Sequence, residues 1–252
     1  AVLGGIEGVG KITAAFVPLM IVIYVTGGIV ALIGSTLLAT GIVSASSVIA
    51  DYIDDLKSEH ALKPAGRIAR AQMQEYIKDA DEAGYQGIAS LSFTAVFRHK
   101  LMAMSEADRN AYWAGQTELE RTQRQQSCVF EGVDSPYAAR AIASWERTFG
   151  TVERALSDGR PWLMGDAFTL AEVNLAPFIA RLDGLSMLPV WLDERPRSSK
   201  WWAAIKARPS YSEARVGPSA GEEATYAREG AKLVDDLRKR RAAYLERYRG
   251  KV

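Results

Sequence analysis

The chain contains two contrasting patterns of hydrophobic and polar residues. No residue between Ile12 and Ala50 is charged, and Ile12–Ile33 is mostly apolar. Beyond Pro64, apolar residues recur at the three- and four-residue spacing of one helix face. The longest such stripe comprises Ala141, Trp145, Phe149, Val152 and Leu156. The pattern predicts a largely helical protein preceded by an uncharged segment.

Capping and breaking signals divide the helical part. They predict helices over Ala65–Leu101, Ser105–Arg124, Ser135–Leu156, Lys200–Ala207 and Gly221–Arg249, and another beginning at Thr169. Ser105–Asp108 and Thr169–Glu172 each have the spacing of a capping box. The charged residues of Gly221–Arg249, including the basic run at 238–241, are predicted to form a solvated face.

The helix after Thr169 has no charge between Val173 and Ala180, so we expect it to be surrounded on most sides. Pro177 lies inside it, where proline costs ~3 kcal/mol. We therefore expect either a kink at Pro177 or dense packing that holds the helix together.

The uncharged part allows two interpretations. Ile12–Ile33 is long enough for a membrane span, which needs about 20 apolar residues. Alternatively, the β-forming run Met20–Val25 belongs to buried strands. Residues 37–44 predict two short strands, and the helix after them is predicted to bury Val48, Ile49, Tyr52 and Ile53 and to expose Asp51, Asp54 and Asp55. The start at Ala1 is expected of a processed product or a fragment.

Composition excludes several classes of function. The 252 residues carry a formal net charge of +1, which provides no overall electrostatic attraction to nucleic acid. A single cysteine, Cys128, cannot form an intramolecular disulfide. With only two histidines, His60 and His99, and one cysteine we expect no zinc site, while carboxylate metal sites stay possible.

Residues 37–214 resemble the cytosolic glutathione transferase superfamily. The resemblance rests on Pro161–Leu182 (PWLMGDAFTLAEVNLAPFIARL), on Trp201 followed by Arg208–Tyr211 (RPSY), and on SSVIADYIDD at 46–55. The charged tail is similar to the lignin β-etherase branch of that superfamily. Residues 1–34 resemble one segment of the sodium/alanine symporter family.

The resemblance implies a mainly α fold, in which an all-helical glutathione transferase C-terminal domain follows a truncated thioredoxin-like α/β portion. The expected parts are an apolar segment at 1–34, a thioredoxin-like remnant at 35–62, and the helical domain with its tail at 63–252. The segment at 1–34 is either a membrane span or an altered first part of the thioredoxin-like domain.

The resemblance also implies glutathione as cosubstrate, held at its γ-glutamyl carboxylate by Ser46 and Ser47. The alternative is that these serines only cap a helix. The acceptor pocket is expected near Tyr85, Phe93, Arg98 and Trp113, although aromatic residues at helical spacing are more often core. No thiol-activating residue is identified, because about 36 residues precede the expected third strand where the family has about 60; Cys128 lies too late in the chain.

The implied function is thiol conjugation, or glutathione-dependent ether or halide cleavage, on a hydrophobic electrophile by a cytoplasmic homodimer. The alternatives are a non-catalytic helical interaction module, or a membrane-tethered or fusion product with a symporter-like span in residues 12–33.

Overall fold

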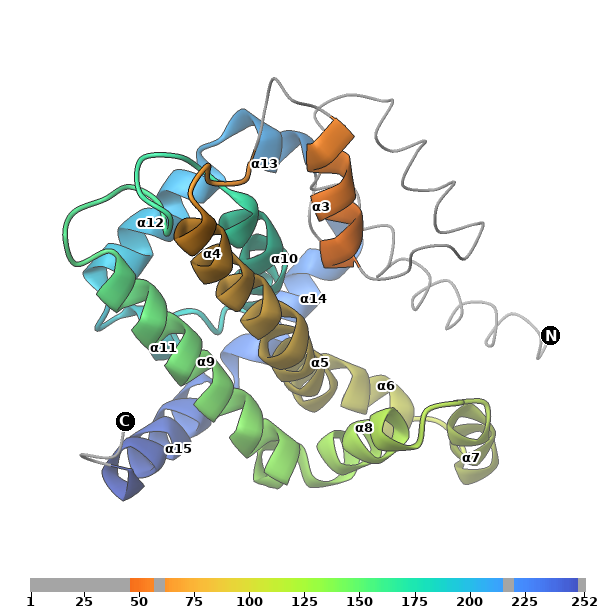
Figure 1. Ribbon diagram of the computed structural model, residues 1–252. Coiled ribbons are helices and arrows are strands. Elements are labelled where there is room, and N and C mark those ends of the chain that lie inside the picture. Colours follow the sequence, from red (N-terminus) through yellow and green to blue (C-terminus); the bar gives the residue numbers. More distant parts are fainter. Residues whose placement is uncertain (1–45, 57–61, 215–219, 249–252) are drawn as a thin grey trace. The chain divides into compact units, whose positions relative to one another are not determined.

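The computed structural model describes residues 46–56, 62–214 and 220–248, which are helical almost throughout (Figure 1). Within these ranges no strand occurs, and the only bridge joins Trp162 to Gly165. The mainly α fold is therefore confirmed. The strands predicted at 37–44 and the symporter-like residues 1–34 lie outside the described residues.

The helices follow one another along the described chain, and a loop of residues 156–169 separates α9 from α10. They are α3 (Ser46–Leu56), α4 (Arg67–Asp79), the π-helix η2 (Ala80–Gly84), α5 (Tyr85–Ser92), the π-helix η3 (Phe93–Phe97), α6 (Arg98–Met102), α7 (Glu106–Ala114), α8 (Leu119–Glu131), the 3-10 turn η4 (Gly132–Asp134), α9 (Pro136–Ala155), α10 (Leu170–Gly184), α11 (Pro189–Leu192), α12 (Pro196–Lys206), α13 (Pro209–Ala214), α14 (Ala220–Ala231) and α15 (Val234–Arg247). None of these helices combines the length and the apolar character that crossing a membrane requires.

The chain divides into two compact units. Unit 1 consists of residues 1–81, 155–177 and 197–217, and unit 2 of residues 82–154, 178–196 and 218–252. The core of unit 1 includes Ile49, Met73, Leu163, Leu170, Trp201 and Ile205.

An aromatic row forms the centre of unit 2. The Trp145 and Phe149 rings of α9 lie 5.6 Å apart, and Phe149 lies 6.3 Å from Trp191 of α11. All three are almost completely buried. The stripe predicted over Ser135–Leu156 is confirmed as the buried face of α9, since Ala141 and Val152 are also inaccessible, as is Leu156 directly after the helix.

α10 is buried around its whole circumference between Leu170 and Ala180. Pro177 stands inside it and does not end it. The helix is therefore densely packed on both sides of the proline.

Three helix boundaries differ from prediction. The expected helix Ser105–Arg124 is interrupted after α7, whose C-cap is Gly115, and resumes at Leu119. The expected helix Gly221–Arg249 is divided into α14 and α15, with a turn in which the Leu233 amide donates to the Gly230 carbonyl. Ala65–Leu101 contains the two π-helical turns η2 and η3.

Two predicted faces also need correction. Ile68 is 78% exposed, because it lies five residues before Met73 and so about 140° around α4 from the buried face. On α3, Ile49 and Ile53 are buried as predicted, but Val48 and Tyr52 are exposed. Asp54, predicted on the solvent face, is buried; its Oδ1 accepts a hydrogen bond from the Leu62 amide at 2.6 Å, and burial raises its pKa.

Candidate functional site

The start of α10 is fixed by a buried carboxylate. Oε2 of Glu172 accepts hydrogen bonds from the amide and the hydroxyl of Thr169, each at 2.9 Å, which confirms the capping box. Oε1 of the same carboxylate accepts from the Leu163 amide at 2.6 Å. Glu172 is fully buried, and desolvation raises its pKa. One side chain thus joins the helix start to the loop that precedes it.

The RPSY element is joined to this same loop. The Arg208 guanidinium lies 3.9 Å from the ring centre of Phe168 and 5.6 Å from that of Trp162. The two rings meet edge to face at 5.0 Å. The loop at the start of the Pro161–Leu182 motif and the RPSY element at Arg208–Tyr211 are therefore in direct contact within unit 1.

The start of α3 holds the two serines expected to bind a ligand. α3 begins at Ser46, which is partly exposed. The Ser47 hydroxyl, mostly buried, donates to Oδ2 of Asp81 at 2.5 Å. Asp81 lies in the π-helical turn η2, and such turns are often found at functional sites. A helix N-terminus, a hydroxyl and a carboxylate therefore lie together in unit 1.

These groups suit a ligand that carries both signs of charge. The free amides and dipole of a helix N-terminus favour an anion. The Asp81 carboxylate, in direct contact with Ser47, favours a cation at the same place. A carboxylate and an ammonium on neighbouring atoms, as in the end group of an amino acid, match this arrangement. The assignment of Ser46 and Ser47 as ligand-binding residues stays a prediction.

The four expected pocket residues are not gathered at one point. Trp113 belongs to a core cluster with Leu101 and Val129, and Phe93 packs against that cluster. Tyr85 is 41% exposed, and its ring meets that of Phe178 at 6.5 Å. The guanidinium of Arg98 lies against Gly132, whose φ is +63°. Their role as a substrate pocket also stays a prediction.

Cys128 has the surroundings of an inert thiol. It is completely buried on α8. Burial raises its pKa, although the Ser135 hydroxyl, 3.7 Å from its sulfur, partly offsets this effect. A buried, protonated thiol is a poor nucleophile. Within the described residues there is also no group of three potential metal ligands.

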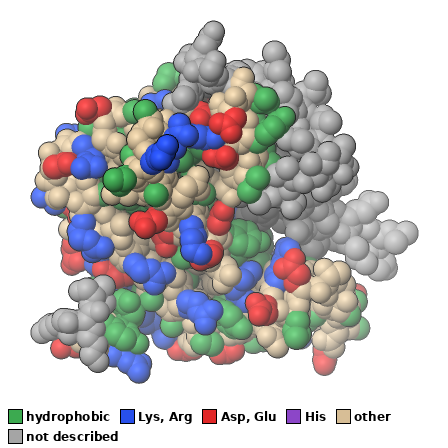
Figure 2. Space-filling view, viewed as in Figure 1, with side chains coloured by type: hydrophobic (Ala, Val, Ile, Leu, Met, Phe, Trp, Pro, Cys, Tyr) green, Lys and Arg blue, Asp and Glu red, His purple; other side chains and the backbone are tan. Residues whose placement is uncertain are grey.

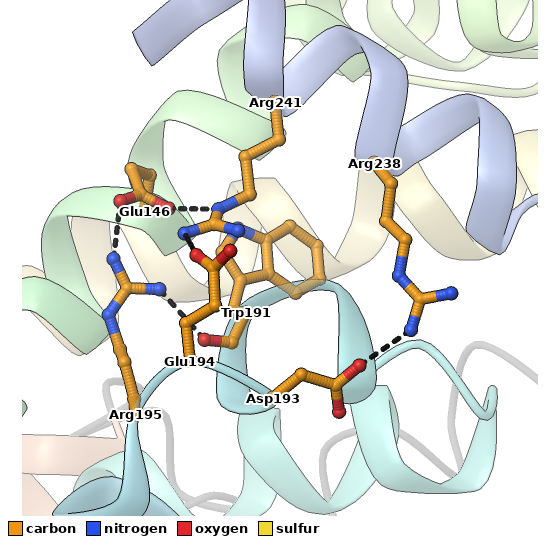
Figure 3. Close-up of polar contacts among 7 residues, drawn as sticks. All are labelled: Glu146, Trp191, Asp193, Glu194, Arg195, Arg238 and Arg241. Carbon is orange, nitrogen blue, oxygen red and sulfur yellow. Dashed lines mark hydrogen bonds and ion pairs between the residues drawn. The ribbon is translucent and has the colours of Figure 1, made fainter.

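A buried charge cluster, shown in Figure 3, connects α9, the segment after α11, and α15. The Glu146 carboxylate accepts from Arg195 at one oxygen and from Nε of Arg241 at the other, the latter at 2.5 Å. Arg241 also donates to Glu194 at 3.0 Å, and Arg195 to the Trp191 carbonyl at 2.8 Å. The three residues Glu146, Arg195 and Arg241 are each less than 10% exposed.

The cluster corrects the prediction that the basic run at 238–241 is only a solvated face. Arg241 is buried, and Arg238 and Arg240 pair with Asp193 and Asp134, outside their own helix. Within α15, Asp235 and Asp236 pair at i,i+3 with Arg238 and Lys239. No local spacing could have revealed these partners, because they come from distant parts of the chain.

The comparisons with known proteins agree with this architecture. Residues 135–207 match the family model of the glutathione S-transferase C-terminal domain. Glutathione S-transferase TCHQD of Arabidopsis thaliana is 35% identical over 65 residues, which are 26% of this chain and 24% of that protein. The chain thus spans about a quarter of the length of this curated relative.

Two solved structures have a similar fold. Beta-etherase LigF from Sphingobium sp. strain SYK-6 is 20% identical, with a TM-score of 0.58, over 68% of this chain and 72% of that one. A glutathione transferase from Burkholderia graminis with two glutathione molecules bound per subunit is 19% identical, with a TM-score of 0.50, over 71% and 62%. Residues 135–207 are therefore similar to the glutathione S-transferase C-terminal domain, and the fold of the chain is similar to those of the two solved structures.

Proposed function

We propose that this chain is a glutathione transferase-like protein, which binds glutathione and directs its sulfur to a hydrophobic electrophile. The family domain supports the proposal, as do a neighbour of similar fold that was crystallised with glutathione and another that is a β-etherase. The observation that carries it is the Ser47–Asp81 contact at the start of α3.

The proposed binding mode follows from the charges at that point. The γ-glutamyl end of glutathione carries an α-carboxylate and an α-ammonium. The carboxylate would accept from the Ser46 hydroxyl and from the free amides at the start of α3. The ammonium would donate to Asp81, whose carboxylate already accepts from Ser47.

The proposed reaction is a thiolate substitution. The glutathione sulfur forms a bond to an electrophilic carbon of the substrate, while an ether oxygen or a halide leaves with the bonding electron pair and the thiol proton passes to solvent. The group that lowers the thiol pKa is not assigned to a residue of this chain. Cys128 is unsuited to any part of this step because it is buried and protonated. Of the four candidate pocket residues, Tyr85 is the one most accessible to a substrate.

The homodimer, the hydrophobic electrophile as partner and the cytoplasmic location are parts of the same proposal. They rest on the relationship to glutathione transferases alone. Light scattering of the full chain tests the dimer, with twice the 27.6 kDa chain mass as the expected result.

Calorimetric titration with glutathione, followed by a thiol-conjugation assay, tests the function. We expect Asp81→Asn and Ser46→Ala each to weaken binding about tenfold, since a hydrogen bond to a charged group contributes roughly 1.5–3 kcal/mol. Glu75→Gln, an exposed change on α4, is the matched control and should bind as the parent does. Absence of binding at millimolar glutathione would overturn the proposal and favour the non-catalytic module.

A further inference from the structure

α3 is apolar on more of its circumference than its packing uses. Ile49 and Ile53 are 1% and 7% exposed, whereas Val48, Tyr52 and Leu56 are 52%, 44% and 52% exposed. The latter three stand at i, i+4 and i+8 and form one continuous line, here named the α3 stripe. Figure 2 shows hydrophobic side chains in this region beside acidic ones. Together the stripe, Ile49 and Ile53 span roughly 140° of the helix, more than the roughly 100° that a surface helix needs.

The orientation of α3 is fixed by polar contacts on its other sides, so the stripe cannot rotate into the core. Lys63 bridges Asp51 and Asp55 at 3.0 and 2.6 Å. The buried Asp54 carboxylate holds the Leu62 amide. Rotating the helix to bury the stripe would break these contacts and would expose Ile49 and Ile53. The stripe is therefore an exposed apolar surface available for a further contact.

We propose that the α3 stripe is the docking surface for this chain's own uncharged segment, residues 12–44. The segment directly precedes α3 in the sequence, and its last residue, at position 44, stands four positions before Val48. Because no residue from Ile12 to Ala50 is charged, the segment has apolar side chains to bury and no charge to desolvate in doing so. This docking assigns residues 12–33 to a packed layer on α3 instead of to a membrane span.

A second copy of the chain is a poorer occupant. Three half-exposed side chains of this size would bury only about 300 Å² per copy, on the scale of 150–250 Å² for a whole aromatic side chain. Stable association needs about 800 Å² per partner. A covalently attached segment needs no such area, because its effective concentration at the stripe is already high.

Thiol labelling of the full chain tests the docking, since the one native cysteine is buried. Val48→Cys and Leu56→Cys place a thiol in the stripe, and Asp55→Cys places one on the exposed charged side of the same helix. We expect maleimide to label the stripe thiols at least tenfold more slowly than the Asp55→Cys thiol. Adding Val22→Asp and Val25→Asp should abolish that protection while the far-ultraviolet circular dichroism of the helices stays unchanged.

Three results would overturn the proposal. One is equal labelling of the stripe and control thiols. Another is protection that appears only in phospholipid vesicles, because then a bilayer covers the segment. The third is protection that falls on dilution together with the sedimentation coefficient, because then a second copy covers the stripe. None of these readouts depends on glutathione binding, so this proposal and the proposed function can fail separately.

Discussion

Arg241 on α15 donates a hydrogen bond from Nε to Oε2 of Glu146 on α9, at 2.5 Å and across 95 residues of chain. Both residues are buried, and Arg195 binds the other oxygen of the same carboxylate. Two buried cations and one buried anion are stable only as a set, because each alone would carry a large desolvation cost. The C-terminal helix α15 is thus held to α9, within unit 2, by buried charges that stabilise one another.

Replacing Glu146 with Gln should therefore destabilise the protein strongly. The change leaves the buried Arg195 without its carboxylate partner and Arg241 with only the exposed Glu194, for which we expect a loss of about 3 kcal/mol in the free energy of unfolding. Urea denaturation followed by tryptophan fluorescence measures it. Asp193→Asn is the control, since the Asp193–Arg238 pair is largely exposed and should cost less than 1 kcal/mol. Similar losses in both variants would contradict this account.

The same carboxylate should make stability depend on acid. Burial opposes ionisation of Glu146, but the hydrogen bonds from Arg241 and Arg195 outweigh it and hold its pKa below the usual range. A lowered folded-state pKa gives stability that is complete above the unfolded value of about 4.3 and is lost as the pH falls further. The difference in unfolding free energy between the parent and Glu146→Gln should therefore shrink below about pH 4. A difference that is flat down to pH 3 would show that the pair is not ionic.

Glu172 should show the opposite dependence. Its pKa is raised by desolvation, although three hydrogen bonds partly offset this effect. The folded state then keeps its proton at a pH where the unfolded state has lost it, so the contribution is complete below about pH 4.3 and declines as the pH rises through the raised pKa. The difference in the free energy of unfolding between the parent and Glu172→Gln should decrease as the pH rises over that range. If it widens with pH instead, the carboxylate is stabilised as an anion at this site.

How much the sequence could predict depended on the distance between partners. The Thr169–Glu172 box was predictable because its two residues stand three apart and the motif satisfies backbone groups of one turn. The bond from Glu172 to the Leu163 amide was not, since it depends on the path of the preceding loop. Likewise Ser47 was a candidate from its place at a helix start, whereas its partner Asp81, 34 residues away, gave no local signal.

The charged tail is a second example of a contact that local sequence patterns could not predict. Its interleaved acids and bases have the composition of a solvated helix, and most of them are exposed. Arg241 differs only through the carboxylate on α9 that faces it, which periodicity within the tail cannot reveal. Gly230 of α14 illustrates the same point, because its close approach to the Leu185 carbonyl gives no signal in the sequence.

That neighbour makes Gly230 a sensitive position. A Cβ built on Gly230 would lie 1.9 Å from the Leu185 carbonyl oxygen, a backbone atom that cannot move aside. We expect Gly230→Ala to lower the free energy of unfolding by about 3 kcal/mol, at the upper end of overpacking costs. Gly221→Ala in the same helix meets nothing within 4 Å and should stabilise slightly through helix propensity. Thermal unfolding of the two variants side by side would detect the difference, and equal melting temperatures would exclude the close contact.

Arg208 provides a test of how the two family motifs are connected. Its guanidinium lies over Phe168 and near Trp162, and a partly desolvated cation–π contact contributes roughly 1–2 kcal/mol. Arg208→Met keeps much of the apolar stem and removes the charge, so a loss of about 1 kcal/mol is expected, together with a change in Trp162 fluorescence. Lys206→Met is the matched control, because the Lys206 ammonium lies 5.8 Å from the Trp202 ring centre and the side chain is exposed. If both variants unfold at the same urea concentration as the parent, the two motifs are held together by apolar packing alone.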